Sequence, residues 1–191
     1  MKAGAVPLSA RRKQDRNMSH APSSTGLFLV KSLTPLEVLI VESNPVDALR
    51  TITAFRAAGL TNGIHCVRDG EDALSYLRRE GRYTQARIPD LIFLDLAQPR
   101  VSGLQALKII RSTPALKHIP VVVAADAEEP AFIQAVYSMH GNGFIRKPPD
   151  LLQFLRCIES CYEYWVSIVT LERQPRRRSH DTAEAPAVTT M

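Results

Sequence analysis

From Leu36 onward, short continuous apolar runs alternate with stretches whose apolar residues recur at helical spacing. The runs predict five strands, and each is followed by a predicted helix. Five such repeats in one stretch predict an α/β fold, with a doubly wound parallel sheet and helices on both faces. The predicted strands are Val38–Val41, Ile64–Val67, Leu91–Leu94, Val121–Ala124 and Gly143–Ile145.

Polar and proline residues mark the starts of several predicted helices. Asn44 precedes Pro45, which places a capping side chain before a proline suited to the first turn. Glu129-Pro130 opens the fourth helix, and Asp150 caps the last one. The polar stretch 79–89 is predicted to be a long connection before the third strand.

The last predicted helix carries more apolar residues than one face requires. One helical stripe can pack on the sheet. Tyr162, Tyr164 and Val166 lie off that stripe, so a second face is expected to contact a partner or to stay partly in water. The stripe consists of Leu151, Phe154, Leu155, Ile158, Cys161, Trp165, Ile168 and Val169.

The net charge of +5 belongs to the ends of the chain. Residues 1–33 hold six basic residues and one acidic residue, whereas residues 34–171 hold 14 basic and 15 acidic residues. The composition predicts a disordered basic leader (1–33), one folded domain (34–171) and a disordered tail (172–191). The short basic clusters at both ends lack interleaved aromatic residues, so no specific nucleic-acid partner is expected.

No apolar stretch approaches the length of a membrane span, and no signal peptide is recognised, so a cytoplasmic protein without membrane contact is predicted. The three cysteines Cys66, Cys157 and Cys161 have no metal-ligand spacing. They are interpreted as packing residues in a reducing compartment.

Charged residues follow three of the predicted strands. Glu42 follows the first strand, Asp95 the third and Lys147 the fifth. Ligands bind such sheets at the carboxyl ends of the strands, so the three side chains are expected to share one crevice. Two acids and a lysine suit a divalent cation and a phosphoryl group, which is the chemistry of an aspartate that accepts phosphate.

These residues resemble the receiver domain of a response regulator. The resemblance rests on Ile40-Val41-Glu42-Ser43-Asn44-Pro45, Leu91-Ile92-Phe93-Leu94-Asp95-Leu96 and Phe144-Ile145-Arg146-Lys147-Pro148, with 53 residues from Glu42 to Asp95 and 52 from Asp95 to Lys147. The connection at 79–89 and the ending at 163–171 are similar to phytochrome-associated single-domain response regulators.

The resemblance implies a flavodoxin-like five-stranded sheet of order 2-1-3-4-5. It implies Mg²⁺-dependent phosphoryl transfer from a histidine kinase to Asp95, and a cis peptide bond before Pro148. No enzyme activity is expected beyond self-catalysed phosphorylation and dephosphorylation.

In this hypothesis Asp95 is the nucleophile and Lys147 pairs with a phosphoryl oxygen. Glu42, Asp95 and the Ala97 backbone carbonyl would bind Mg²⁺. The alternatives are that Asp95 is a loop or capping residue, that Glu42 merely pairs with Lys147 at the rim, and that Lys147 is a solvated loop residue.

Two residues depart from the family pattern. Ser43 stands where a second acid is usual, so Mg²⁺ binding is expected to be weak, with Ser43 either a weak ligand or bridged to the ion by water. Ala125 stands where a hydroxyl usually binds the phosphoryl group, and the following Asp126 would repel that group if it turned inward. Phe144 occupies the place of an aromatic switch residue, and a plain core role remains the alternative.

The leading hypothesis is a single-domain response regulator that signals through protein–protein contacts. Its partners would be a histidine kinase, phytochrome-like on the narrower resemblance, and a second copy bound through Tyr162, Trp165 and Ile168. The alternative is a degenerate receiver that docks partners without phosphate, which Ser43 and Ala125 favour. A flavin or nucleotide enzyme on this fold is disfavoured, because the loop after the first strand is acidic and has no glycine.

Overall fold

The computed structural model describes residues 36–60, 63–127, 129–165, 169 and 171. The predicted leader (1–33), the predicted tail (172–191) and Ile168 lie outside the described residues. Strands and helices alternate as expected, and a short 3₁₀ helix interrupts the long connection. The elements are β1 (Val38–Val41), α1 (Pro45–Ala57), β2 (Ile64–Val67), α2 (Gly70–Arg78), η1 (Gly81–Tyr83), β3 (Leu91–Asp95), α3 (Gly103–Ser112), β4 (Val121–Ala125), α4 (Pro130–Ser138), β5 (Gly143–Arg146) and α5 (Leu151–Glu163).

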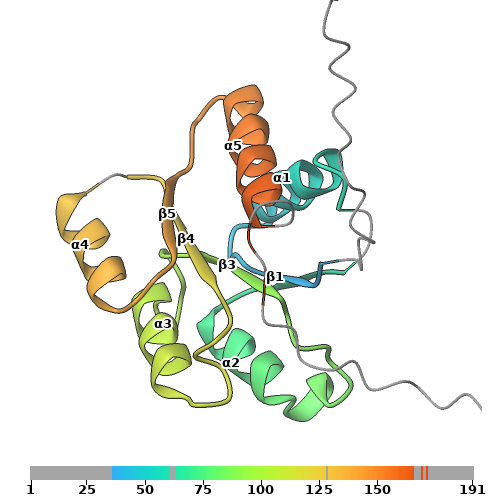
Figure 1. Cartoon of the computed structure of the whole chain (residues 1–191), viewed down its shortest axis with the longest axis vertical. Coiled ribbons are helices and arrows are strands. Elements are labelled where there is room, and N and C mark those ends of the chain that lie inside the picture. Colours follow the sequence, from blue (N-terminus) through green and yellow to red (C-terminus); the bar gives the residue numbers. More distant parts are fainter. Residues whose placement is uncertain (1–35, 61–62, 128, 166–168, 170, 172–191) are drawn as a thin grey trace, which may run out of the picture. The chain divides into compact units, whose positions relative to one another are not determined.

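The five strands form one parallel sheet in the order β2-β1-β3-β4-β5, which confirms the predicted fold class. Figure 1 shows α1 and α5 side by side on one face of the sheet, with α2 and α3 on the other face. The winding direction reverses between β1 and β3, because the chain adds β2 on one side of β1 and continues through β3 on the other. This arrangement opens a crevice at the carboxyl ends of these two strands.

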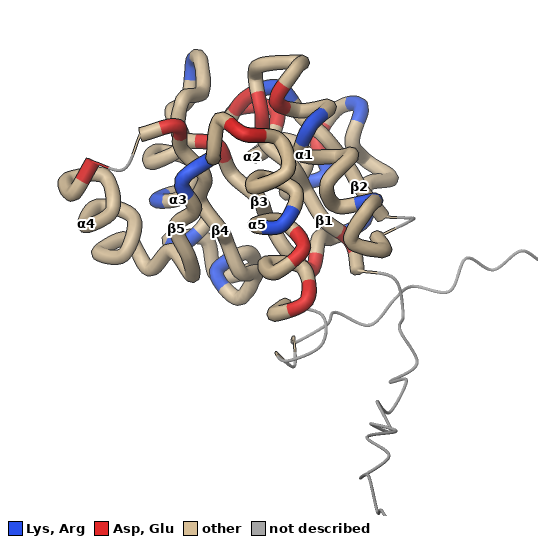
Figure 2. Tube along the Cα trace, turned by 90° about the horizontal axis from the view of Figure 1, so that it is seen from above, with Lys and Arg blue, Asp and Glu red and all other residues tan. Residues whose placement is uncertain are grey.

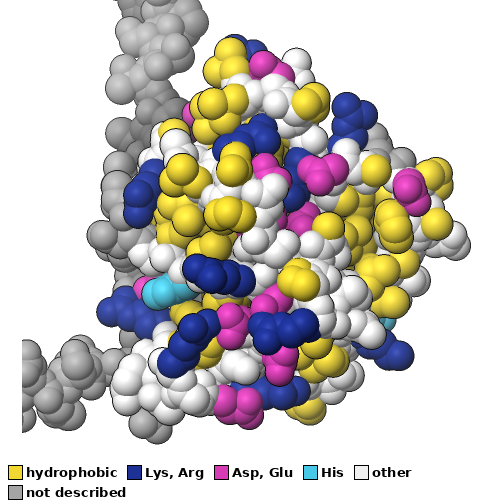
Figure 3. Space-filling model, turned by 180° about the vertical axis from the view of Figure 1, so that it is seen from behind, with side chains coloured by type: hydrophobic (Ala, Val, Ile, Leu, Met, Phe, Trp, Pro, Cys, Tyr) yellow, Lys and Arg dark blue, Asp and Glu magenta, His cyan; other side chains and the backbone are white. Residues whose placement is uncertain are grey.

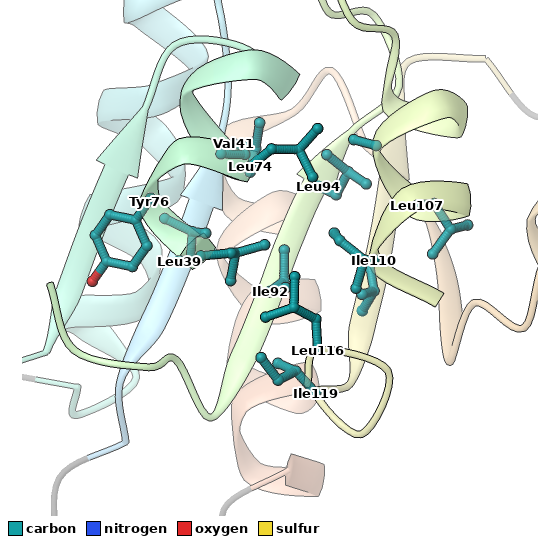
Figure 4. Close-up of a cluster of buried hydrophobic side chains, with 14 of the residues drawn as sticks. Leu39, Val41, Leu74, Tyr76, Ile92, Leu94, Leu107, Ile110, Leu116 and Ile119 are labelled. Atoms are coloured by element: carbon teal, nitrogen blue, oxygen red, sulfur yellow. The ribbon is translucent and has the colours of Figure 1, made fainter. Parts of the chain in front are cut away.

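Alternate residues of the central strands point to opposite faces and build two cores. Leu39, Ile92 and Val123 point toward α2 and α3, and they form one core with Leu74 and Leu107 from those helices. Figure 4 shows most of these side chains meeting between the sheet and the two helices. Because helices cover both faces of the sheet, the central strands have nearly continuous apolar sequences.

The second core lies between the sheet and the pair α1 and α5. Phe55 of α1 meets Phe93 of β3 edge to face, with ring centroids 5.7 Å apart. Phe154 and Ile158 of α5 complete this core, and both are buried. The same core buries Trp165, just past the end of α5. Most of the apolar stripe of the last helix therefore packs on its own domain, as the helical spacing predicted, but Leu151 at its start is 51% exposed.

The helix starts follow the local chemistry of the sequence. The Asn44 side chain accepts a hydrogen bond from the Val46 N–H, and Asp150 accepts one from the Gln153 N–H. Ser102 and Gln105 form a reciprocal capping box at α3. Each cap satisfies backbone donors that a helix leaves free at its first turn. The start of α1 is thereby fixed three residues after Glu42.

Charges of both signs are interspersed over the described domain (Figure 2). On the face in Figure 3, basic side chains lie beside acidic ones and neither sign dominates. Within the described part of the chain, no helix has the length and apolarity that a bilayer crossing requires. The cytoplasmic location stays a prediction.

Glu37, which precedes β1, is a buried carboxylate held by two basic side chains. Its Oε1 accepts a hydrogen bond from Arg87 at 2.7 Å, and its Oε2 lies 3.0 Å from the His65 Nε2. Burial alone would raise the pKa of Glu37, but the bonds and charges of Arg87 and His65 outweigh it and lower the pKa below its ordinary value of 4.5. The interaction joins the long connection to the start of the sheet.

Replacing Glu37 by glutamine is expected to lower the free energy of unfolding near neutral pH by about 1–3 kcal/mol, because the variant keeps the shape but loses the buried charge. The folded-state pKa is lowered, so this stabilisation is present above pH 4.5 and is lost as the pH falls through the folded value. Urea unfolding measured across this pH range is expected to show that the free energy of unfolding falls less on acidification in the variant than in the natural sequence. An equal decrease in both proteins would contradict the conclusion that the ionised Glu37 carboxylate stabilises the fold.

Candidate functional site

Asp95, Glu42 and Lys147 meet at the carboxyl edge of the sheet, although more than 50 residues separate each from the next. Asp95 is the last residue of β3, Glu42 follows β1 and Lys147 follows β5. The Lys147 Nζ lies 2.7 Å from the Glu42 Oε2 and 2.8 Å from the Asp95 Oδ1. All three residues are buried, with relative exposures of 3–6%. The rim and solvated alternatives for Glu42 and Lys147 do not agree with this burial.

The second carboxylate oxygen of Asp95 is held from the loop after β3. Its Oδ2 accepts hydrogen bonds from the Ala97 N–H at 3.0 Å and from the Gln98 side-chain amide at 3.1 Å. Gln98 also donates to the Val41 carbonyl at 3.3 Å, which fixes its amide beside β1. The Asp95 Oδ1, by contrast, has only the Lys147 ammonium beside it. Oδ1 is therefore the oxygen with a lone pair left for a ligand or an electrophile.

Burial and charge shift the pKa values of two members of the site. Burial and the charge of Asp95 raise the pKa of Glu42 above its ordinary value, and the bonds from Lys147 and the Asn44 N–H do not fully offset them. Burial would lower the pKa of Lys147, but its bonds to Asp95 and Glu42 outweigh it and raise that pKa. The ammonium is therefore strongly held in its charged form between two acids.

The oxygens that would bind a divalent cation lie together at this edge. Glu42 and Asp95 offer carboxylates, and the Ala97 carbonyl faces Ser43, whose hydroxyl donates to it at 3.3 Å. The described residues include no cluster of three or more His, Cys, Asp or Glu side chains placed to hold a metal. Two carboxylates and one carbonyl fit Mg²⁺, which usually keeps several water ligands. They provide less negative charge than three acids would.

Ala125 and Phe144 lie on the neighbouring strands. Ala125 ends β4, and its carbonyl accepts a hydrogen bond from the Lys147 N–H at 2.8 Å. No side-chain donor is present at this position, because alanine carries only a methyl group. Phe144 pairs with Val123 across the two strands and packs, half-buried, on the core beneath α2 and α3. In this position it acts as a core aromatic, and its role as a switch stays a prediction.

Two further residues belong to the site, and the strand-end pattern missed their contacts. Asp47, in the first turn of α1, places its Oδ2 3.9 Å from the Lys147 Nζ. Gln98, in the loop after β3, holds the Asp95 carboxylate through its side-chain amide. The sequence signal for both residues was a polar side chain within six residues after the end of a strand. Their direction of approach depends on the path of each loop.

The prediction of a cis peptide bond before Pro148 is wrong, since no cis bond occurs among the described residues. The trans isomer is the intrinsically favoured one even before proline. Lys147 still reaches the site, because its backbone N–H is fixed by Ala125 and its long side chain spans the remaining distance.

Tyr162 and Trp165, the two predicted dimer residues that the structure describes, lie away from this site, at the end of α5. Tyr162 is half-buried, and Trp165 is buried in the domain's own core. Tyr164, which stacks edge to face on Trp165, is 49% exposed. Trp165 therefore has its main contacts within one chain. The homodimer stays a prediction.

Comparisons with known proteins agree with this geometry. Residues 38–159 match the model of the response regulator receiver domain. The probable methanogenesis regulatory protein FilR2 of Methanothrix harundinacea is 35% identical over 133 residues, which cover 69% of this chain and 84% of that protein.

Two solved structures of response regulators resemble this fold closely. The phosphorylated cyanobacterial phytochrome response regulator RcpA has a TM-score of 0.69 and 36% identity, covering 72% of this chain and 99% of that one. The Mn²⁺-bound form of Rcp1 has a TM-score of 0.68 and 29% identity, covering 73% and 100%; Rcp1 is a response regulator of Synechocystis. On its matched residues, its strand order and its acidic crevice, this chain belongs to the response regulator receiver domain family.

Proposed function

We propose that this chain is a phosphoreceiver of a two-component system, in which Asp95 accepts a phosphoryl group from a histidine kinase. The observation that supports this most directly is the ammonium of Lys147, buried between the Asp95 and Glu42 carboxylates at 2.8 and 2.7 Å. Buried charges carry a large desolvation cost, so such a cluster is retained where its charges are used.

In the proposed step, a carboxylate oxygen of Asp95 attacks phosphorus while the bond from phosphorus to the donor histidine nitrogen breaks. The histidine keeps the electron pair of that bond and takes a proton from solvent, and Asp95 becomes an acyl phosphate. Oδ1 is the attacking oxygen, because Oδ2 is already held by Ala97 and Gln98. Lys147 then moves from carboxylate to phosphoryl oxygen, where its charge offsets the added negative charge.

Glu42, Asp95 and the Ala97 carbonyl would hold Mg²⁺, and the ion would neutralise charge on the transferred group. Lys147 competes for the same carboxylates before the ion binds. The hydroxyl of Ser43, which donates to the Ala97 carbonyl, provides no negative charge. Mg²⁺ binding is therefore weak.

The partner kinase is proposed to be phytochrome-like. RcpA is described as a phytochrome response regulator, and RtBRR, 31% identical to this chain, is described as a bacteriophytochrome response regulator. The proposed domain spans residues 34–171, with basic flanking segments on both sides. Its output is contact with other proteins, including a second copy of this chain.

Incubation with acetyl phosphate and Mg²⁺ tests the assignment. The intact protein is expected to gain one phosphoryl group by mass spectrometry, and Asp95→Asn is expected to gain none, because an amide is not a nucleophile for this step. Removal of Mg²⁺ with a chelator is expected to abolish incorporation.

The matched control is Asp126→Asn, which removes the exposed acid just after β4. It is expected to be phosphorylated at least as well as the natural sequence. Absence of Mg²⁺-dependent incorporation from both acetyl phosphate and a kinase would reject the phosphoreceiver and favour the degenerate receiver, toward which no comparison points.

A further inference from the structure

Arg50 joins three parts of the molecule beside the site. It lies on α1, and its side chain is 28% exposed. Its Nη1 donates to the Asp47 Oδ1 at 3.2 Å, and its Nη2 donates to the carbonyls of Pro148 and Pro149 at 3.3 and 3.4 Å. The guanidinium also lies 5.1 Å from the ring centroid of Phe154, on α5.

The two carbonyls belong to the residues directly after Lys147. Proline has no N–H, so Pro148 and Pro149 cannot donate any backbone hydrogen bond. Their carbonyls are the only polar backbone groups that these two residues offer for attachment. Arginine offers several donors in one rigid plane, so one side chain can serve both carbonyls and a carboxylate.

Lys147 itself is fastened from the other side, where its N–H donates to the Ala125 carbonyl at 2.8 Å. The backbone on both sides of Lys147 is thus attached, to β4 before the prolines and to α1 after them. Asp47, which Arg50 also binds, lies 3.9 Å from the Lys147 Nζ. Arg50 partly neutralises this acid, which would otherwise compete with Asp95 for the ammonium.

We propose that Arg50 is a positioning residue for Lys147: it fixes the Pro148–Pro149 loop to α1 and keeps the ammonium beside Asp95. The consequence for phosphoryl transfer rests on the proposed function, whereas the consequence for the loop does not. A misplacement of about 1 Å in such a site slows a reaction about 100-fold.

The test compares Arg50→Ala, Arg50→Lys and, as matched control, Arg56→Ala. Arg56 is an exposed arginine in the last turn of the same helix. Two quantities are measured for each protein: the rate of phosphorylation by acetyl phosphate, and the hydrogen-exchange protection of the Lys147 amide. Thermal melting establishes the temperature at which all variants are folded.

Arg50→Ala is expected to lower the maximal phosphorylation rate about 10- to 100-fold with little change in the donor concentration for half-saturation, because the donor still binds but Lys147 is misplaced. Protection of the Lys147 amide is expected to fall, while amides of β1 and β3 keep theirs. The rate and the Lys147 protection of Arg50→Lys are expected to lie between those of the natural sequence and Arg50→Ala, since an ammonium cannot bind both carbonyls and Asp47 in one plane. Arg56→Ala is expected to match the natural sequence.

Unchanged rate and unchanged Lys147 protection in Arg50→Ala would overturn the proposal. A uniform loss of protection over the whole sheet would also overturn it, because it would show a general stabilising role. If the natural sequence takes up no phosphoryl group, the proposed function fails, and the protection of the Lys147 amide still decides whether Arg50 fixes the loop.

Discussion

Replacing Lys147 by methionine is expected to abolish detectable phosphorylation of Asp95 and to lower the free energy of unfolding by about 3–5 kcal/mol at neutral pH. Methionine keeps much of the side-chain length but removes the charge that lies between two buried carboxylates, 2.7 and 2.8 Å away. The carboxylates then face each other in a buried site without a compensating cation.

The loss of stability is expected to depend on pH in a defined direction. The pKa of Glu42 is already raised by burial and by Asp95, and removal of Lys147 raises it further. A carboxyl group whose folded pKa is raised stabilises the protein below its unfolded pKa and ceases to do so as the pH rises through the folded value. The variant is therefore expected to recover part of its stability on acidification from neutral pH toward 4.5, the ordinary value for Glu42.

Urea unfolding at several pH values measures this effect, with Lys108→Met as the matched control. Lys108 is exposed on α3, so its replacement is expected to change stability little. Adding Glu42→Gln to Lys147→Met is expected to restore stability, because it removes one of the two unpaired acids. A Lys147→Met protein as stable as the natural sequence at every pH would show that the acids are not buried together as described.

Replacing Ser43 by aspartate is expected to raise the affinity for Mg²⁺ about 10- to 100-fold. At an effective dielectric near 20, two unit charges about 4 Å apart interact by about 4 kcal/mol, and the partial exposure of position 43 reduces the net gain. The Ser43 hydroxyl already lies 3.3 Å from the Ala97 carbonyl. A carboxylate at this position would therefore lie beside the oxygens of Glu42, Asp95 and Ala97 that are proposed to bind Mg²⁺. The third acid repels Glu42 and Asp95, so the metal-free variant is expected to be less stable.

Calorimetric titration with Mg²⁺ measures the affinity, and Mn²⁺ binding followed by electron paramagnetic resonance provides an independent value. The matched control is Ser43→Asn, which has the shape of aspartate without its charge. Asparagine is expected to change the affinity by only a few-fold, because a neutral oxygen adds little attraction for the ion. Equal affinities for the aspartate and asparagine variants would show that charge at position 43 does not limit metal binding.

The elements of this protein could be predicted from its sequence largely because the three central strands, β1, β3 and β4, are buried on both faces. Such strands appear as continuous apolar runs, and the predicted starts of all five agree with the structure. Three predicted ends fall one residue short, because Asp95, Ala125 and Arg146 belong to strands although their side chains are charged or small. Whether the last residue of a strand pairs depends on the adjacent strand in the sheet. The local sequence does not specify that strand.

The sequence by itself determined the five repeats, the caps of α1 and α5, and the positions of Glu42, Asp95 and Lys147 at strand ends. Only the tertiary structure decided which groups those side chains contact. The bridge of Lys147 between two acids and the attachment of its loop by Arg50 join residues about 50 to 105 positions apart. These contacts are set by the path of each loop after its strand and by the direction in which each long side chain leaves that loop. Both depend on packing between α1, β4 and α5, so no single stretch of sequence encodes them.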